Sequence, residues 1–152
     1  INIEPIIQSV VDDYNSIYKV KKDIKINYEN DGKKEYSING IENRIEQMIA
    51  NLLDNSISFT EKGGKIIVNI SISSNRKITV KIIDEGQGFK EKDTSKIFRR
   101  FYSNRPDKFG EHSGLGLNIV KNLVELHDGK ILASNRPNNK GAIIEISFPS
   151  MQ

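Results

Sequence analysis

The sequence contains no cysteine, which excludes disulfide bonds and thiolate chemistry and leaves only His, Asp, Glu and Asn side chains as candidate metal ligands. No uninterrupted apolar run approaches the length of a membrane-spanning helix, and the first residues do not have the pattern of a signal peptide. A strong excess of positive charge is also lacking. Because the net charge is only +3, we expect no nucleic-acid partner. This mild positive charge is compatible with a smaller anionic ligand.

The length and composition fit one compact domain. The chain has 152 residues, of which 36% are hydrophobic, so we expect a single core built from residues 1–152. The first residue is Ile1 rather than methionine, and we therefore expect the chain to be a fragment of a larger protein.

Hydrophobic periodicity predicts the secondary structure. Apolar residues at helical spacing predict helices over residues 4–18, 41–59 and 114–127. Alternating apolar residues predict strands over residues 22–28, 65–73, 77–83, 130–134 and 142–148, with a further short strand at 36–38. This order predicts an α+β fold, a two-layer sandwich in which three helices cover one mostly antiparallel, mixed sheet.

Two asparagines interrupt the apolar pattern of the second predicted helix. Asn51 and Asn55 are four residues apart, so they lie on the same side of that helix. Asparagine is a poor helix former because its amide competes for backbone hydrogen bonds, and the pair therefore needs a reason. Two interpretations are open: buried amides that bond to the neighbouring sheet, or amide oxygens that coordinate a hard cation such as Mg²⁺.

A carboxylate and two glycines follow the predicted hairpin. Asp84 comes at the end of the second strand, and Gly86 and Gly88 come directly after it. The further oxygen ligands that a calcium loop needs are missing, which leaves a plain turn or an acceptor held at the sheet edge. Since the glycines make room for a flat group, such an acceptor suits the exocyclic amine of a purine.

Residues 90–112 are polar and irregular, apart from the short block 97–102. A segment of this length inside a compact domain is typical of a lid. Its cations, which include Arg100 and Arg105, fit either a solvated surface or a lid that closes over a nucleotide.

A glycine-rich sequence opens the third predicted helix: Ser113-Gly114-Leu115-Gly116-Leu117. Free amides at a helix N-terminus, with glycines that let another group approach closely, favour binding of phosphate. A tight turn before a helix has the same composition, so this stretch alone leaves both interpretations open.

Four of these segments together resemble the nucleotide-binding boxes of sensor histidine kinases. In chain order, residues 51–55, 84–89, 97–102 and 113–117 resemble the N box, the first glycine box, the F box and the second glycine box. The resemblance covers essentially the whole chain and identifies it as a member of the histidine kinase ATP-binding domains of the GHKL superfamily. Ser58-Phe59 and the lid sequence 102–106 resemble the ChvG-type envelope and acid-stress sensors.

The resemblance implies a Bergerat-type ATP-binding fold with a mobile lid over about residues 90–112, and the use of ATP and Mg²⁺. By position, it implies that Asn55 binds Mg²⁺ beside Asn51, and that Asp84 accepts from the adenine amine. It further implies that Phe59 packs on the adenine ring. The lid residues Arg100 and Arg105 would assist transfer together with Asn51 and Asn55, and the other nucleotide contacts would be made at Gly86, Gly88, Ser113, Gly114, Leu115, Gly116 and Leu117.

Several positions depart from the family's pattern. Ser58 replaces a basic residue that meets phosphate, Ser103 replaces an arginine, and His112 replaces a glycine, while Ala142 stands where a hydroxyl residue is frequent. Neither His112 nor His127 has the setting of the family's phosphoacceptor; we interpret His112 as part of the lid and His127 as structural. The phosphoacceptor is therefore expected on a separate, histidine-containing dimerisation domain of the same parent protein, absent from this chain.

The resemblance also implies partners. It implies that the parent is a membrane-bound homodimer of the bacterial inner membrane, that this domain is cytoplasmic, and that a response regulator receives the phosphoryl group. Two other functions stay open. One is a GHKL-type ATPase, although Asn51 occupies the position of the glutamate base in those enzymes; the other is a catalytically weak nucleotide-binding module, prompted by Ser58, Ser103 and His112.

Overall fold

A computed structural model describes residues 1–33, 35–89, 97–98, 116–137 and 140–151 of the chain. The described helices are α1 (Glu4–Lys22), α2 (Glu42–Ser58) and α3 (Gly116–Leu126). The strands are β1 (Lys25–Asn30), β2 (Lys65–Ile72), β3 (Lys77–Asp84), β4 (Lys130–Asn135) and β5 (Ala142–Pro149). Within these ranges, no helix combines the length and hydropathy that crossing a bilayer requires.

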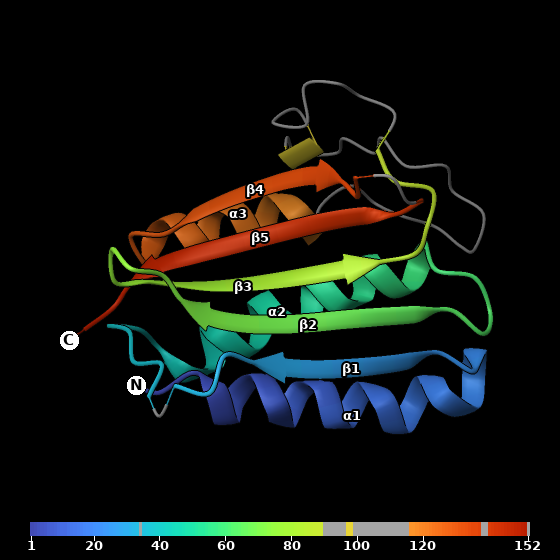
Figure 1. Cartoon of the computed structure of the whole chain (residues 1–152), viewed down its shortest axis with the longest axis horizontal. Coiled ribbons are helices and arrows are strands. Elements are labelled where there is room, and N and C mark those ends of the chain that lie inside the picture. The colour runs from blue at the N-terminus through green and yellow to red at the C-terminus, as the bar shows by residue number, and fades with distance from the viewer. Residues whose placement is uncertain (34, 90–96, 99–115, 138–139, 152) are drawn as a thin grey trace.

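The five strands form one mixed sheet in the order β1-β2-β3-β5-β4. Strands β1 and β2 are parallel, and the other neighbouring pairs are antiparallel. A parallel pair needs a long crossover, which here contains α2. Figure 1 shows α2 and α3 behind the sheet and α1 along its β1 edge. The predicted two-layer sandwich with three helices is therefore confirmed.

The core lies between the helices and one face of the sheet. On β2, β3 and β5, buried apolar residues alternate with partly exposed ones, as the period of two in the sequence predicts. Helix α2 contributes the largest helical share of this core, with its buried apolar residues at Ile45, Met48, Ile49, Leu52, Leu53 and Ile57. Since the buried faces of these elements are mainly apolar, the buried polar side chains Asn55 and Asp84 lie near the ends of α2 and β3.

Three predicted elements differ from the structure. The first strand covers Lys25–Asn30 rather than residues 22–28, because Lys22 still belongs to α1. Helix α1 continues to Lys22 rather than residue 18, because the lysines of its last turn interact favourably with the helix C-terminus and Asp23 closes the helix with a φ of 53°. The predicted strand at 36–38 is a single bridge between Asn2 and Ser37. Its three residues are too few to extend a ladder, although the Ser37 carbonyl also accepts from the Met151 backbone N–H.

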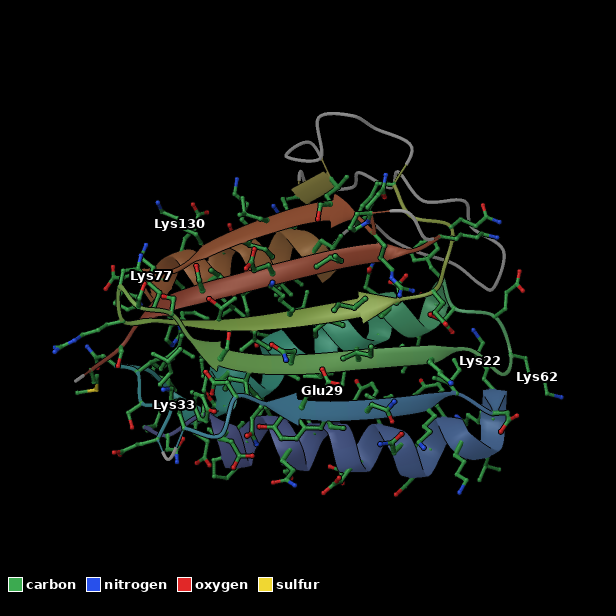
Figure 2. All side chains as sticks on the ribbon, viewed as in Figure 1. Lys22, Glu29, Lys33, Lys62, Lys77 and Lys130 are labelled. Carbon is green, nitrogen blue, oxygen red and sulfur yellow. The ribbon has the colours of Figure 1, made fainter. Side chains whose placement is uncertain are left out.

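Lys22 joins the end of α1 to the turn that follows α2. Its ammonium donates to the carbonyl of Ile57 at 2.9 Å and of Thr60 at 3.3 Å, while its own carbonyl accepts from Gly63 N–H at 2.9 Å. Partial burial lowers the pKa of Lys22. Figure 2 shows Lys22 and Lys62 at the same end of the sheet, opposite Lys77 and Lys130. The C-terminal end of α2 is therefore held by a side chain from another helix.

Replacement of Lys22 by methionine should destabilise the domain while keeping the aliphatic stem. Two charge-assisted bonds to helix-end carbonyls are lost, but the group is partly exposed, so we expect a loss of about 1 kcal/mol. The melting temperature should fall by about 2–4 °C in thermal unfolding. Lys19→Met is the matched control, since Lys19 is an exposed lysine of the same helical turn. Equal shifts for both variants would contradict the proposed tether.

Candidate functional site

The predicted site residues that the structure describes lie toward one end of the sheet, where several strands begin or end. In Figure 1, α2, β3 and β4 end and β5 begins at this end of the sheet, on the right of the view, and α3 begins nearby. The N box, the first glycine box and the described part of the second, Gly116 and Leu117, are therefore brought to the same end of the sheet by the topology. The described part of the F box, residues 97 and 98, packs against the start of α3, as set out below.

The two asparagines of α2 differ in exposure. Asn55 is only 4% exposed, and Asn51, one turn earlier, is partly exposed. Phe59 closes the helix and is 5% exposed, so its ring lies against the protein interior rather than in solvent. The end of α2 thus places a buried amide and an aromatic ring about one helical turn apart, at the end of the sheet where β3 also ends.

Tyr14 of α1 fixes the outer side of this part of α2. Its hydroxyl donates to the Asp54 carboxylate at 2.9 Å and approaches the Ala50 carbonyl at 3.3 Å. Burial raises the pKa of Tyr14 well above its ordinary value, and the neighbouring Asp54 raises it further. The hydroxyl therefore stays protonated as a donor, and α2 is held on both sides of Asn51.

Asp84 is buried at the end of β3, with 2% of its surface exposed. Its Oδ1 accepts two backbone hydrogen bonds, from Gly86 N–H at 2.9 Å and from Ala142 N–H at 3.2 Å. One bond comes from the loop that follows Asp84, and the other comes from the first residue of β5. The carboxylate is therefore fixed in place by two separate segments.

The loop after Asp84 makes close contacts with the turn between β4 and β5. Gly88 has a φ of +76°, and a Cβ there would lie 2.6 Å from Asn135 Oδ1. Gly141 has a φ of +138°, and a Cβ there would overlap the carbonyl oxygen of Asp84. Both positions combine a conformation that side chains rarely adopt with a contact that excludes one. The glycines bring the two segments close enough to bond.

A hollow of about 220 Å³ lies between the turn after α2 and the loop after β3. Two of its lining residues, Phe59 and Gly86, are also predicted nucleotide contacts. The Glu85 carboxylate at its wall accepts from Lys65 N–H at 2.7 Å, which holds the start of β2 against the loop. The other lining residues are Thr60, Glu61, Lys62, Gly63, Gly64, Gln87 and Lys140.

The first turn of α3 contacts the described part of the F box. Ile97 and Phe98 are buried, and Asn118 Nδ2 donates to the Phe98 carbonyl at 3.1 Å. Leu117 is buried, whereas a Cβ on Gly116 would meet no atom within 4 Å. The remaining predicted residues of the lid and of the second glycine box lie outside the described residues; they are Arg100, Arg105, His112, Ser113, Gly114 and Leu115.

His127 lies at the other end of α3 and has two backbone bonds. Its Nδ1 contacts the Leu123 carbonyl at 2.8 Å, and its Nε2 accepts from Ile41 N–H at 3.2 Å. The ring also meets Phe148 edge-on, with ring centroids 6.5 Å apart. It joins the end of α3 to the start of α2, which agrees with the structural interpretation of His127.

Sequence reasoning missed the residues that hold the site from outside the motifs. Asn135 ends β4 and Gly141 comes directly before β5, and Ala142 contributes its backbone N–H rather than a side chain. Asn118 and Lys22 bond to main-chain carbonyls far away in the sequence. No sequence motif marks these residues. The one signal in the sequence is a glycine directly before a predicted strand, which points to Gly141.

Ser56, next to Asn55, carries a buried hydroxyl for which the described residues offer no hydrogen-bond partner. Ser56→Ala should therefore stabilise the domain, because it removes an unsatisfied polar group and improves helix propensity, together about 1 kcal/mol. We expect a rise of about 2–4 °C in melting temperature. Ser58→Ala serves as control, since Ser58 Oγ donates to the Asp54 carbonyl at 3.1 Å. A fall in melting temperature for Ser56→Ala would show that the hydroxyl is hydrogen-bonded in solution.

Residues 40–152 match the protein family described as histidine kinase-, DNA gyrase B-, and HSP90-like ATPases. The sensor protein ChvG of Agrobacterium fabrum is 35% identical over 155 residues, covering 97% of this chain and 26% of that protein. The sensor protein KdpD of Clostridium acetobutylicum is 42% identical over 108 residues, covering 69% of this chain and 12% of that protein. The chain therefore spans about a quarter of the length of its ChvG relative.

Solved structures agree in fold. A nucleotide-free form of the catalytic domain of histidine kinase ThkA has a TM-score of 0.83 and 27% identity, covering 99% of this chain and 93% of that chain. ThkA in complex with the response regulator protein TrrA has a TM-score of 0.80 and 25% identity, covering 99% of this chain and 41% of that chain.

Proposed function

The chain belongs to the family of histidine kinase-, DNA gyrase B- and HSP90-like ATPases and is a catalytic domain of the sensor histidine kinase type, so we propose that it transfers the γ-phosphoryl group of ATP to a histidine on a separate dimerisation domain. The observation that carries this proposal is the buried Asp84, which two backbone N–H groups hold at the end of the sheet where α2 also ends. A carboxylate in that setting accepts from the adenine amine and selects ATP.

The adenine ring would lie between the end of α2 and the loop after β3. Phe59 supplies an aromatic surface at the helix end, and Gly86 and Gly88 leave room for a flat base. Because Phe59 and Gly86 line the same hollow, a base bound there would have protein on more than one side. Burial of the ring and one directional hydrogen bond together account for recognition of the base.

Magnesium would be held by Asn55, with Asn51 shaping the same region. In the described ranges, no group of three or more His, Asp or Glu side chains is placed to hold a metal ion. This fits Mg²⁺, which keeps water and substrate phosphates among its ligands and needs few protein oxygens. Bound there, the ion would offset the negative charge of the phosphates during transfer.

The phosphates would be contacted by the second glycine box and the lid. The N-terminus of α3 carries free amides and a partial positive charge, which favours anions at Ser113, Gly114, Leu115, Gly116 and Leu117. Arg100 and Arg105 of the lid, over about residues 90–112, would add positive charge where it develops during transfer. Phe98, buried and bonded to Asn118, anchors the segment to α3.

The parent protein would use this domain in two-component signalling. We expect a membrane-bound homodimer whose cytoplasmic dimerisation domain carries the phosphoacceptor histidine, with residues 1–152 as one ATP-binding unit. A response regulator would then receive the phosphoryl group. The ThkA structure with its response regulator supports this partner class by analogy.

Labelled ATP distinguishes this function from the alternatives. The chain is incubated with Mg²⁺, γ-labelled ATP and a separately made dimerisation domain of the parent protein. Label on the histidine of that domain is the expected result. Release of phosphate without labelled histidine would favour a GHKL-type ATPase instead. Measurable ATP binding with neither product would favour a nucleotide-binding module.

A further inference from the structure

Asn135, the last residue of β4, binds both main-chain groups of a single residue in another segment. Its Oδ1 accepts from Phe89 N–H at 2.6 Å, and its Nδ2 donates to the Phe89 carbonyl at 3.0 Å. Since the backbone N–H only donates and the carbonyl only accepts, the two contacts fix the orientation of the amide. The side chain thus makes the pair of bonds that a neighbouring strand would make.

This contact closes the loop that begins at Asp84. At one end of the loop, Ala142 N–H bonds to the Asp84 carboxylate and Gly141 packs on the Asp84 backbone. At the other end, Asn135 holds Phe89. Asn135 and Ala142 are themselves paired across β4 and β5, so both ends of the loop are bound to the same pair of strands.

The geometry of Gly88 is matched to Asn135. A Cβ on Gly88 would lie 2.6 Å from Asn135 Oδ1 and 3.1 Å from the Gly141 carbonyl. The loop backbone approaches the amide this closely only because residue 88 has no side chain. Gly88 therefore has a role in seating the loop on Asn135, in addition to any room it leaves for the base.

We propose that Asn135 is a positioning residue of the nucleotide site, which acts as a strand partner for Phe89 and holds the loop of residues 84–89 in the conformation that fits adenine. This inference rests on the proposed function. Asn135 acts through Phe89 and the loop, with no contact to ATP required. A loop bound at only one end samples more conformations, and each ATP molecule that binds must then order it.

The test compares Asn135→Ala with a control variant that is destabilised elsewhere. Gly32→Ala serves this purpose, because Gly32 has a φ of +79° with open space around its Cβ, in the turn after β1. Affinities for ATP and GTP are measured by calorimetry, and melting temperature by thermal unfolding. We expect Asn135→Ala to weaken ATP binding about tenfold and to narrow the ATP-over-GTP preference. Gly32→Ala should leave both unchanged despite a lower melting temperature.

A second variant and a second measurement separate positioning from stability. Asn135→Asp keeps the acceptor for Phe89 N–H but sets an oxygen against the Phe89 carbonyl, so it should lose affinity nearly as much as Asn135→Ala. Amide exchange followed by NMR should be faster at Phe89 and Gly86 in Asn135→Ala, with the β3 amide of Ile82 unchanged. Ser134→Ala, at an exposed neighbour on β4, should alter neither affinity nor exchange.

The outcomes separate this inference from the proposed function. Unchanged ATP affinity and base preference in Asn135→Ala overturn the inference, whatever happens to the melting temperature. If ATP binding is lost in Asp84→Asn but retained in both Asn135 variants, the proposed function stands and only the inference fails. If the unaltered chain binds no ATP, both fail together.

Discussion

Asp84→Asn is expected to lose most ATP affinity while the domain stays folded. The asparagine oxygen can still accept from Gly86 and Ala142 N–H, so the structural bonds are kept. The amide nitrogen must then take the other position, where its protons face the adenine amine and donor meets donor. Losing a charge-assisted bond and leaving buried donors unpaired costs about 2–4 kcal/mol, or roughly 30- to 700-fold in dissociation constant.

Calorimetric titration with ATP measures this effect, and thermal unfolding shows whether the fold is kept. GTP provides an internal control, because its base carries a carbonyl where adenine carries the amine. The variant should discriminate less between the two nucleotides than the unaltered chain does. Unchanged ATP binding in a folded Asp84→Asn variant would remove Asp84 from the adenine site and the main support for the proposed function.

Asn55→Ala should abolish magnesium-dependent phosphoryl transfer, with a rate at least about 100-fold lower. The substitution removes the buried amide oxygen that we assign to Mg²⁺, and Asn55→Asp should also fail because it adds negative charge beside the phosphates. Since Asn55 is at the end of α2, the loss of stability should stay near 1 kcal/mol. Single-turnover transfer from Mg-ATP to the separate dimerisation domain is the measurement.

Binding without the metal tests whether Asn55 acts through Mg²⁺. With EDTA present, ADP affinity should be nearly the same in Asn55→Ala and the unaltered chain, and the difference should emerge only when Mg²⁺ is added. Asn69→Ala is a suitable control, because Asn69 is a partly exposed asparagine of β2 between the buried Val68 and Ile70. Normal transfer by a folded Asn55→Ala variant would exclude this residue from the metal site.

The sequence was sufficient to predict the layer architecture and most elements, because burial repeats with a clear period in each. The alternation of Ile66, Val68 and Ile70 marks β2, and a helical stripe marks α2. Element ends were less accurate. At the end of α1, Lys22 bonds to the carbonyls of Ile57, in the last turn of α2, and of Thr60, just after α2, and the local sequence gives no sign of such distant partners.

The site was predicted unevenly for a similar reason. Some site residues lie in short motifs whose residue types suggest their chemistry, and the structure places them at one end of the sheet: Asn55, Asp84, Gly86 and Gly88. Asn135 is the last residue of β4, and no motif marks it; its importance comes from contact with Phe89, which is remote along the chain. Motif reasoning identifies groups that touch a ligand more readily than groups that hold them.

The contact between Asp84 and Ala142 has a consequence for the order in which the protein folds. The β2–β3 hairpin joins neighbouring residues and can form early, but β3 pairs on its other side with β5, the last strand of the chain. On a ribosome, the aspartate is therefore synthesised long before the backbone N–H that fixes it. ATP affinity should arise only in the final stage of folding, which makes nucleotide binding a reporter of complete chain assembly rather than of early collapse.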